Sequence, residues 1–289
     1  MIDQLLEVLK YIFLGIIQGI TEVLPISSSG HVAIAQFLLK IDTDGGFLFF
    51  IVVNLGSLIA IIYHFRHLIK KLIVNSVIFV FSKKTRNETT EDFCYVIKII
   101  IATIPFGIAG VFLENSINKL YEAYSLFVVA IGLLITSTFL YIIRYAPNKN
   151  VRQTISFKDA LVIGLLQPFS MIPGLSRSGL TTSTGLFRKI SMDTALTFSL
   201  MLYIPISLGA FIYKLGQLFM NPSSVEIVFD TTNVFQYCNY MFAFIFSLLA
   251  TVFSLKYIFK WFRQGKLVYF AAYTLILGLI ALIGAILTF

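Results

Sequence analysis

The sequence contains few charged residues and few cysteines, and each shortage excludes a class of protein or site. Only 12% of the 289 residues are charged, against about 25% in an ordinary soluble domain, so a water-soluble globular protein is excluded. The two cysteines, Cys94 and Cys238, stand far apart without a partner motif and do not make a metal site. The chain also lacks a P-loop, a GxSxG nucleophile elbow and an HExxH zinc motif.

Hydrophobic residues are abundant and occur in long continuous runs. They make up 58% of the chain, and the mean hydropathy is +0.89. Continuous apolar runs predict membrane-spanning helices, whereas the strands of a β-barrel would alternate between apolar and polar residues. We therefore predict an all-α polytopic membrane protein that forms a single integral membrane domain over residues 1–289. The net charge of +8 then indicates basic cytoplasmic loops and contact with anionic lipid headgroups, and no nucleic-acid partner.

Two stretches of the chain, residues 15–31 and 164–179, resemble each other. Each has an apolar run, a proline, a turn rich in small and hydroxyl residues, and a second apolar run, which is the pattern of a helix broken inside a membrane. Five residues recur at the same spacing: Gly15, Gln18, Ser27, Ser29 and Gly30 correspond to Gly164, Gln167, Ser176, Ser178 and Gly179. Broken helices at corresponding positions of two halves indicate the functional site.

The apolar runs divide the chain into two pseudo-repeats, residues 1–145 and 156–289, joined by a polar linker at 144–158. Each half is predicted to contain a re-entrant hairpin followed by three membrane-spanning helices. The hairpins are residues 5–39 and 160–188, and the plain spans are 47–63, 93–113, 126–143, 195–213, 240–257 and 267–289. A basic loop at 66–92 could hold an interfacial helix at 68–81, and a polar link is expected at 114–122. Residues 5–39 could instead form one span and a surface helix.

Lysine and arginine residues predict the orientation in the membrane. Most of them fall in the loops 66–92 and 144–158, at 188–189 and at 256–266, while Lys10, Lys40, Lys119 and Lys214 lie on the opposite side. The positive-inside rule makes the first side cytoplasmic and turns both termini outward. The first hairpin then enters from the outside and the second from the cytoplasm, which predicts an inverted-topology repeat whose hairpin tips meet inside the membrane.

Glu22 is the first candidate functional residue because a carboxylate at membrane depth is costly and by default marks a functional site. Gln18 lies four residues earlier and therefore on the same face of the helix. Ser27, Ser28 and Ser29 can cap the following helix, which would be a purely structural role. His31 could act as a general acid or base, or could orient a serine.

Arg177 lies in the second broken element and carries a planar guanidinium that suits phosphate. Ser176, Ser178 and Thr181 add hydroxyl donors, and Gly174 allows the backbone to approach an anion closely. The alternative is that Arg177 pairs with Glu22 for structural reasons alone. Together these side chains predict a site for a phosphorylated group held at membrane depth.

The motifs around these residues resemble the undecaprenyl-diphosphatase family, the bacitracin-resistance phosphatases. The resemblance rests on Gln18-xxx-Glu22, on the turn at 24–31 and on the Pro173-Gly174-x-Ser176-Arg177-Ser178-x-x-Thr181 motif. It implies hydrolysis of undecaprenyl diphosphate in the bacterial plasma membrane, a divalent cation (Mg²⁺ or Ca²⁺), and a site that opens to the outer face.

The resemblance also suggests roles for the candidate residues. Arg177, Ser176, Ser178 and Thr181 would grip the diphosphate, with Ser28, Ser29 and Gly174 as further substrate-binding residues. Glu22, helped by Gln18, would hold the cation or act as a base. Ser27 would attack the terminal phosphorus or position a water molecule, and His31 would activate Ser27 or protonate the leaving oxygen.

Three residues depart from the pattern expected of that family. Phe50 stands where relatives usually have an acidic residue, Asn54 stands in place of Gln, and Pro168 follows Gln167. The competing interpretation is a transporter or flippase of a lipid phosphate, because inverted repeats with broken helices are also a transporter plan. A homodimer is compatible with the sequence, which does not specify the oligomeric state.

Overall fold

The computed structural model describes residues 2–41, 46–146, 151–220, 234–264 and 267–288. Within these ranges the chain forms ten α-helices and two short 3₁₀ helices, and its one β-bridge joins Arg152 to Ile190. The α-helices are α1 (Ile2–Val23), α2 (Ser28–Leu39), α3 (Gly46–His64), α4 (Arg66–Phe81), α5 (Arg86–Ile142), α6 (Phe157–Leu166), α7 (Arg177–Phe187), α8 (Met192–Met220), α9 (Val234–Arg263) and α10 (Leu267–Thr288).

The apolar helices confirm the prediction of an all-α polytopic membrane protein. Five helical segments of the described chain are long and apolar enough to cross a membrane, and α3 with α4, bent by 72°, can be counted as a sixth. The predicted spans in α3, α8 and α9 lie inside these helices, and α10 covers the last predicted span as far as Thr288. Residues 147–150 of the predicted linker, and the last residue of the chain, lie outside the described ranges.

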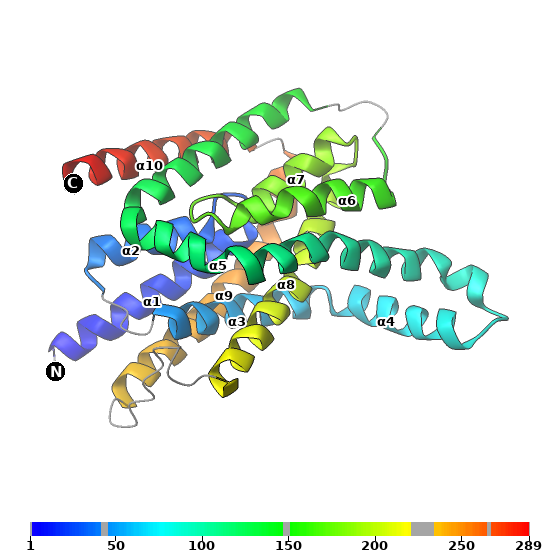
Figure 1. Cartoon of the computed structure of the whole chain (residues 1–289), viewed down its shortest axis with the longest axis horizontal. Coiled ribbons are helices and arrows are strands. Elements are labelled where there is room, and N and C mark those ends of the chain that lie inside the picture. The colour runs from blue at the N-terminus through cyan, green and yellow to red at the C-terminus, as the bar shows by residue number, and fades with distance from the viewer. Residues whose placement is uncertain (1, 42–45, 147–150, 221–233, 265–266, 289) are drawn as a thin grey trace.

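The polar link predicted at 114–122 separates two candidate spans, but it does not break the helix, because α5 continues through it as one helix of 57 residues. The first candidate span, Arg86–Leu113, lies in α5, and the second, Ser125–Tyr145, begins in α5 and ends in the 3₁₀ helix η1 (Ile143–Tyr145). Figure 1 shows that α5 curves back and that its second part runs beside α10. The segment 114–122 contains neither proline nor glycine, so its sequence provides no residue that would end a helix.

Both predicted broken elements are present. In the first, a turn that contains Pro25 separates α1 from α2. In the second, α6 gives way to a 3₁₀ helix, η2 (Gln167–Met171), in whose first turn Pro168 lies. Proline is tolerated there because the first turn of a helix leaves its backbone N–H groups without intrahelical acceptors. A turn at 172–176 then leads into α7.

Glycines allow α1 to pack closely against α9. A β-carbon added to Gly15 would lie 2.3 Å from the carbonyl oxygen of Ala243, and one added to Gly19 would lie 2.3 Å from that of Ser247. Gly164 of α6 approaches Ala102 of α5 in the same way. The first helix of each broken element thus packs against a long helix of the other half, as small residues commonly do between membrane helices.

The two broken elements meet at their tips. The hydroxyl of Ser178 at the start of α7 donates to the carbonyl oxygen of Leu24 in the first turn, at 3.1 Å. Gly30 and Gly174 approach each other so closely that a β-carbon on Gly30 would lie 3.0 Å from the α-carbon of Gly174. The helix α2 buries His31, Val32 and Ala35. This packing favours the hairpin interpretation of residues 5–39 over a surface helix.

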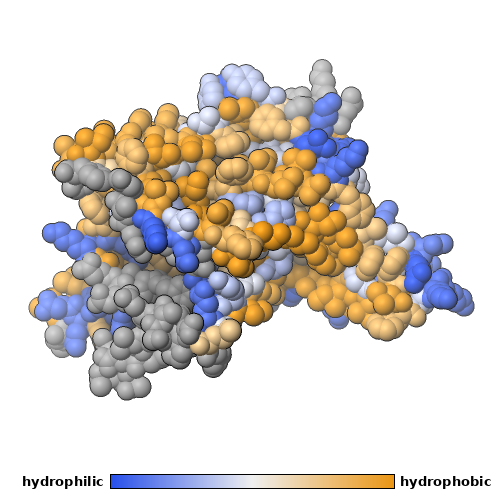
Figure 2. All heavy atoms as spheres, in the orientation of Figure 1, coloured by the Kyte–Doolittle hydropathy of each residue, from blue (hydrophilic) through white to orange (hydrophobic). Residues whose placement is uncertain are grey.

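The ends of the chain lie at one end of the molecule, and the connection between α4 and α5 lies at the other (Figure 1). Figure 2 shows that the visible face is mostly apolar, with hydrophilic residues gathered toward the ends. This distribution matches a protein whose sides contact lipid. Which end faces the cytoplasm, and whether the halves are inverted in the membrane, remain predictions from the sequence.

Candidate functional site

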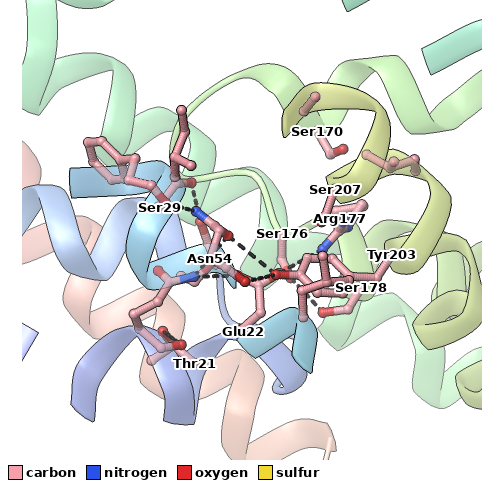
Figure 3. A pocket seen from close by; sticks show the side chains of 18 of the residues that line it. Thr21, Glu22, Ser29, Asn54, Ser170, Ser176, Arg177, Ser178, Tyr203 and Ser207 are labelled. Atoms are coloured by element: carbon pink, nitrogen blue, oxygen red, sulfur yellow. Dashed lines mark hydrogen bonds and ion pairs between the residues drawn. The ribbon is translucent and has the colours of Figure 1, made fainter. Parts of the chain in front are cut away.

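An ion pair joins the two broken elements at the centre of the site. Glu22 lies in the last turn of α1, and Arg177 is the first residue of α7. An Nη2 atom of Arg177 lies 2.6 Å from Oε1 of Glu22, and their side chains are 17% and 6% exposed. Figure 3 shows the two side chains pointing toward each other across the site. The predicted meeting of a guanidinium and a carboxylate inside the helical body is therefore present.

The second oxygen of Glu22 accepts two further hydrogen bonds. Nε2 of Gln18 donates to Oε2 over 2.8 Å, as expected for residues one helical turn apart. The hydroxyl of Ser28, the first residue of α2, donates to the same oxygen over 2.6 Å. These two hydrogen bonds, together with the ion pair, fix the orientation of the Glu22 carboxylate.

Arg177 also contacts the ring of Tyr203 in α8, an interaction that the sequence did not predict. Its guanidinium carbon lies 4.3 Å from the centre of the Tyr203 ring, a cation–π arrangement with α8. The Tyr203 hydroxyl donates to the backbone carbonyl of Asn54 at 3.1 Å, and Gln18 donates to the side-chain oxygen of Asn54, also at 3.1 Å. Asn54 and Tyr203 therefore link α3 and α8 to the ion pair (Figure 3).

The signal for these two residues in the sequence was weak. Asn54 is a polar residue within an apolar span, which is a recognisable hint. Tyr203 is one of 14 tyrosines in a chain rich in aromatic residues, and nothing in its neighbourhood distinguishes it. Only the three-dimensional arrangement reveals its contact with Arg177.

The serines at the two tips form matching local structures. Ser27 caps α2 and accepts a hydrogen bond from the backbone N–H of Gly30, and Ser176 caps α7 and accepts one from Gly179. Ser27 adopts a positive φ of 72°, which is uncommon for a residue with a side chain. Its hydroxyl lies 3.3 Å from that of Ser29. Capping is therefore a demonstrated role of Ser27.

A cavity of about 330 Å³ lies over the ion pair. The predicted site residues in its wall are Gln18, Glu22, Ser27, Ser28, Ser29, Ser176, Arg177 and Ser178. Phe50 and Asn54, two of the departures from the expected pattern, also line it. The cavity thus combines a charged polar floor with apolar walls, as ligand sites commonly do.

Three predicted site residues lie outside the wall of this cavity. His31 makes one hydrogen bond with the carbonyl oxygen of Ser27 (2.6 Å) and one with the hydroxyl of Tyr273 (2.8 Å). The hydroxyl of Thr181 donates to the carbonyl oxygen of Arg177 at 2.8 Å. Gly174 has a φ of 90° and packs against the backbone of Val129. These contacts support the turns that carry Ser27 and Arg177.

The donor set restricts how a divalent cation could bind. Among the described residues, no three His, Cys, Asp or Glu side chains come together as a metal site. Glu22 is a carboxylate in the cavity wall, which also contains the cationic side chains of Arg177 and Lys214 together with hydroxyl and amide groups. Magnesium in phosphate chemistry is commonly held by one or two carboxylates together with substrate phosphates and water. The residues therefore fit a cation that arrives with a phosphorylated substrate.

Comparisons with known proteins identify the family. The family model described as "Bacitracin resistance protein BacA" matches residues 11–280. The chain is similar to undecaprenyl-diphosphatase 1 of Bacillus licheniformis, at 38% identity over 97% of this chain and 99% of the relative. It is 39% identical to the undecaprenyl-diphosphatase of Oceanobacillus iheyensis over 96% of both chains, and 35% identical to that of Acholeplasma laidlawii over 97% of this chain and 98% of the relative. The chain therefore belongs to the bacitracin resistance protein BacA family.

Proposed function

We propose that this protein is an undecaprenyl-diphosphatase of the bacterial plasma membrane. It hydrolyses undecaprenyl diphosphate to undecaprenyl phosphate and inorganic phosphate, which recycles the lipid carrier of cell-wall synthesis and gives resistance to bacitracin. The observation that carries the proposal is the Arg177–Glu22 pair at the meeting point of the two tips, in the wall of a cavity. The names of the relatives support the same reaction.

Substrate binding begins with Arg177. Its guanidinium has several N–H donors, and in the structure one nitrogen is paired with Glu22. A diphosphate in the cavity would accept hydrogen bonds from Arg177 and from the hydroxyls of Ser176 and Ser178. The ring of Tyr203 fixes the plane of the guanidinium, so little side-chain freedom is lost on binding.

The geometry supports Ser28 as the attacking hydroxyl more strongly than Ser27. The hydroxyl of Ser28 already donates its proton to Glu22 over 2.6 Å, and a nucleophile within hydrogen-bond reach of a base is the expected arrangement. In the first step, the Ser28 oxygen bonds to the terminal phosphorus, Glu22 takes the serine proton, and the bond to the bridging oxygen breaks, so that undecaprenyl phosphate leaves. In the second step, water attacks the phosphorus of the phosphoserine, the Ser28 oxygen leaves and regains a proton from that water, and inorganic phosphate is released. Glu22 then gives its proton to solvent.

His31 positions the turn before Ser28 through its hydrogen bond to the backbone of Ser27. One ring nitrogen holds the Ser27 carbonyl and the other holds Tyr273 of α10, which fixes the turn in front of Ser28. This is a positioning role, and it differs from the direct activation of Ser27 that the sequence suggested.

The alternative role of Glu22 is to hold Mg²⁺ or Ca²⁺ together with the oxygens of the diphosphate, in place of taking the serine proton. Such a cation, when bound, neutralises negative charge on the transferred phosphoryl group. Arg177 contributes positive charge at the same place from the protein itself, and it stays in position because Tyr203 and Glu22 hold it.

The test is release of inorganic phosphate from undecaprenyl diphosphate by the purified protein in detergent with Mg²⁺. Arg177→Ala and Glu22→Ala are each expected to lower the rate by about 100-fold or more, since both act on the reacting phosphate. Arg144→Ala and Glu88→Gln are matched controls, because both side chains belong to exposed residues away from the cavity. Full activity in either site variant, or no phosphate release by the native protein, would refute the proposal. The second result would point to a transporter of lipid phosphate.

A further inference from the structure

A second cavity, of about 400 Å³, lies next to the reactive one. It runs between α5 and α8, and η2 contributes Met171 to its wall. The two cavities share part of their walls: Phe106, Ile206, Ala210 and Lys214 line both. The second cavity, which we call the α5–α8 groove, therefore adjoins the reactive cavity at these four residues.

The wall of the α5–α8 groove is almost entirely apolar. It is formed by one face of each helix, with residues spaced three or four apart: Thr103, Phe106, Gly107, Gly110 and Val111 on α5, and Pro205, Ile206, Gly209, Ala210, Tyr213 and Lys214 on α8. The hydroxyl of Thr103 donates to the carbonyl oxygen of Ile99 in its own helix, so it offers little polarity to the groove. Val111 and Tyr213 are 56% and 38% exposed, so the groove is open along the side of the molecule.

Glycines give the groove its depth. A β-carbon added to Gly107, Gly110 or Gly209 would meet no atom within 4 Å. The close packing that explains Gly15, Gly19 and Gly164 therefore does not explain these three. Glycine is also unfavourable inside a helix by about 1 kcal/mol relative to alanine. Three such residues on facing sides of one groove keep the space between α5 and α8 open.

We propose that the α5–α8 groove binds the isoprene units of the prenyl chain nearest to the diphosphate. This inference rests on the proposed function, which places the diphosphate between Arg177 and Glu22. The chain is covalently attached to that diphosphate, so its first units must leave the polar floor along an adjoining apolar wall. The groove supplies such a wall next to the reactive cavity, and its exposed side, at Val111 and Tyr213, leaves room for the rest of the chain in the lipid. The protein thus selects a prenyl diphosphate over other diphosphates by burying the start of its chain.

The test measures binding, so that it does not depend on catalysis. The probes are farnesyl methylenediphosphonate, which cannot be hydrolysed, and inorganic diphosphate, which has no chain. The variants are Gly107→Leu and Gly209→Leu, whose side chains enter open space in the groove. Gly216→Leu is the matched control, because a β-carbon there also meets nothing within 4 Å and Gly216 lines neither cavity.

Each groove variant is expected to weaken binding of the farnesyl compound by about tenfold, since leucine fills space that apolar groups of the chain would bury. Binding of inorganic diphosphate should stay within about twofold of the native value, and Gly216→Leu should change neither. Unchanged farnesyl binding in both groove variants would overturn the proposal and leave the groove to membrane lipid. A parallel loss of inorganic diphosphate binding would also overturn it, since the leucines would then be acting on the polar site. Failure of the proposed function would be recognised separately, as a native protein that binds the farnesyl compound but releases no phosphate from a prenyl diphosphate.

Discussion

Glu22 illustrates how much of the chemistry depends on single side chains. Its two oxygens accept hydrogen bonds from Arg177, Gln18 and Ser28, so the carboxylate connects the predicted anion-binding residue to a hydroxyl that can attack. Removing one partner of a buried, hydrogen-bonded charge leaves the other uncompensated, which is costly. The site is therefore a coupled unit in which binding and proton transfer involve the same residue.

The serine next to Glu22 gives the first prediction. Ser28→Ala should lower phosphate release by about 100-fold or more, because it removes the hydroxyl paired with the carboxylate. Ser27→Ala removes a helix cap, and should cost about 1 kcal/mol of stability while retaining much of the activity. Rates and detergent melting temperatures of both variants provide the comparison. Loss of activity in Ser27→Ala alone would restore Ser27 as the nucleophile.

At the residue scale the sequence identified most of the polar floor of the cavity. Glu22 and Arg177 could be predicted because charged residues inside apolar helices are costly and rarely without a role. Tyr203 could not, because its contribution depends on the face of α8 that meets Arg177. The orientation of the His31 ring could not be predicted either, because it depends on a hydrogen bond to Tyr273, which lies 242 residues further along the chain.

The elements that carry the site are held together by close helix packing. The backbone of Gly19 packs closely against the carbonyl oxygen of Ser247, and the hydroxyl of Thr251 donates to the Gly19 carbonyl oxygen at 3.1 Å. This contact between α1 and α9 fixes the helix that presents Gln18 and Glu22. The repeat in the sequence predicted that such elements exist and that their tips meet, but not which helix each packs against.

Gly19→Ala is the prediction at this scale. The added methyl group would lie 2.3 Å from the Ser247 oxygen, so α1 must shift away from α9. We expect a loss of about 1–3 kcal/mol in stability, seen as a lower melting temperature in detergent. Gly216→Ala is the control, since its methyl group meets no atom within 4 Å. Equal melting temperatures for the two variants would contradict the packing argument.

The helix boundaries show where local sequence signals succeed and fail. Proline lies in both breaks, but proline alone does not predict a break, because Pro105 and Pro205 lie inside α5 and α8. Polar composition at 114–122 marked the gap between two candidate spans but no end of the helix, because the segment contains neither proline nor glycine. The result is a long α5 that turns back beside α10 without a break in its helical backbone.

For the whole molecule, the basic residues predict that both termini face outward and that the α4–α5 connection is cytoplasmic. The structure separates these two regions to opposite ends (Figure 1), which is the arrangement that the prediction needs. Labelling in intact cells tests the orientation, using Glu7→Cys and Glu88→Cys in a background without the two native cysteines. A membrane-impermeant thiol reagent should label Glu7→Cys and spare Glu88→Cys. The reverse labelling pattern would show the opposite orientation in the membrane, with the α4–α5 connection outside the cell.

The proposed function requires Arg177 to bind the diphosphate while it lies beside the negatively charged Glu22. The most direct test of this requirement is the dissociation constant of farnesyl methylenediphosphonate, measured in detergent without divalent cations. Arg177→Ala should bind at least about tenfold more weakly than the native protein, whereas Glu22→Gln should bind at least as tightly, because the guanidinium then loses its competing anion. Native affinity in Arg177→Ala would contradict the account, as would an equal loss of affinity in both variants.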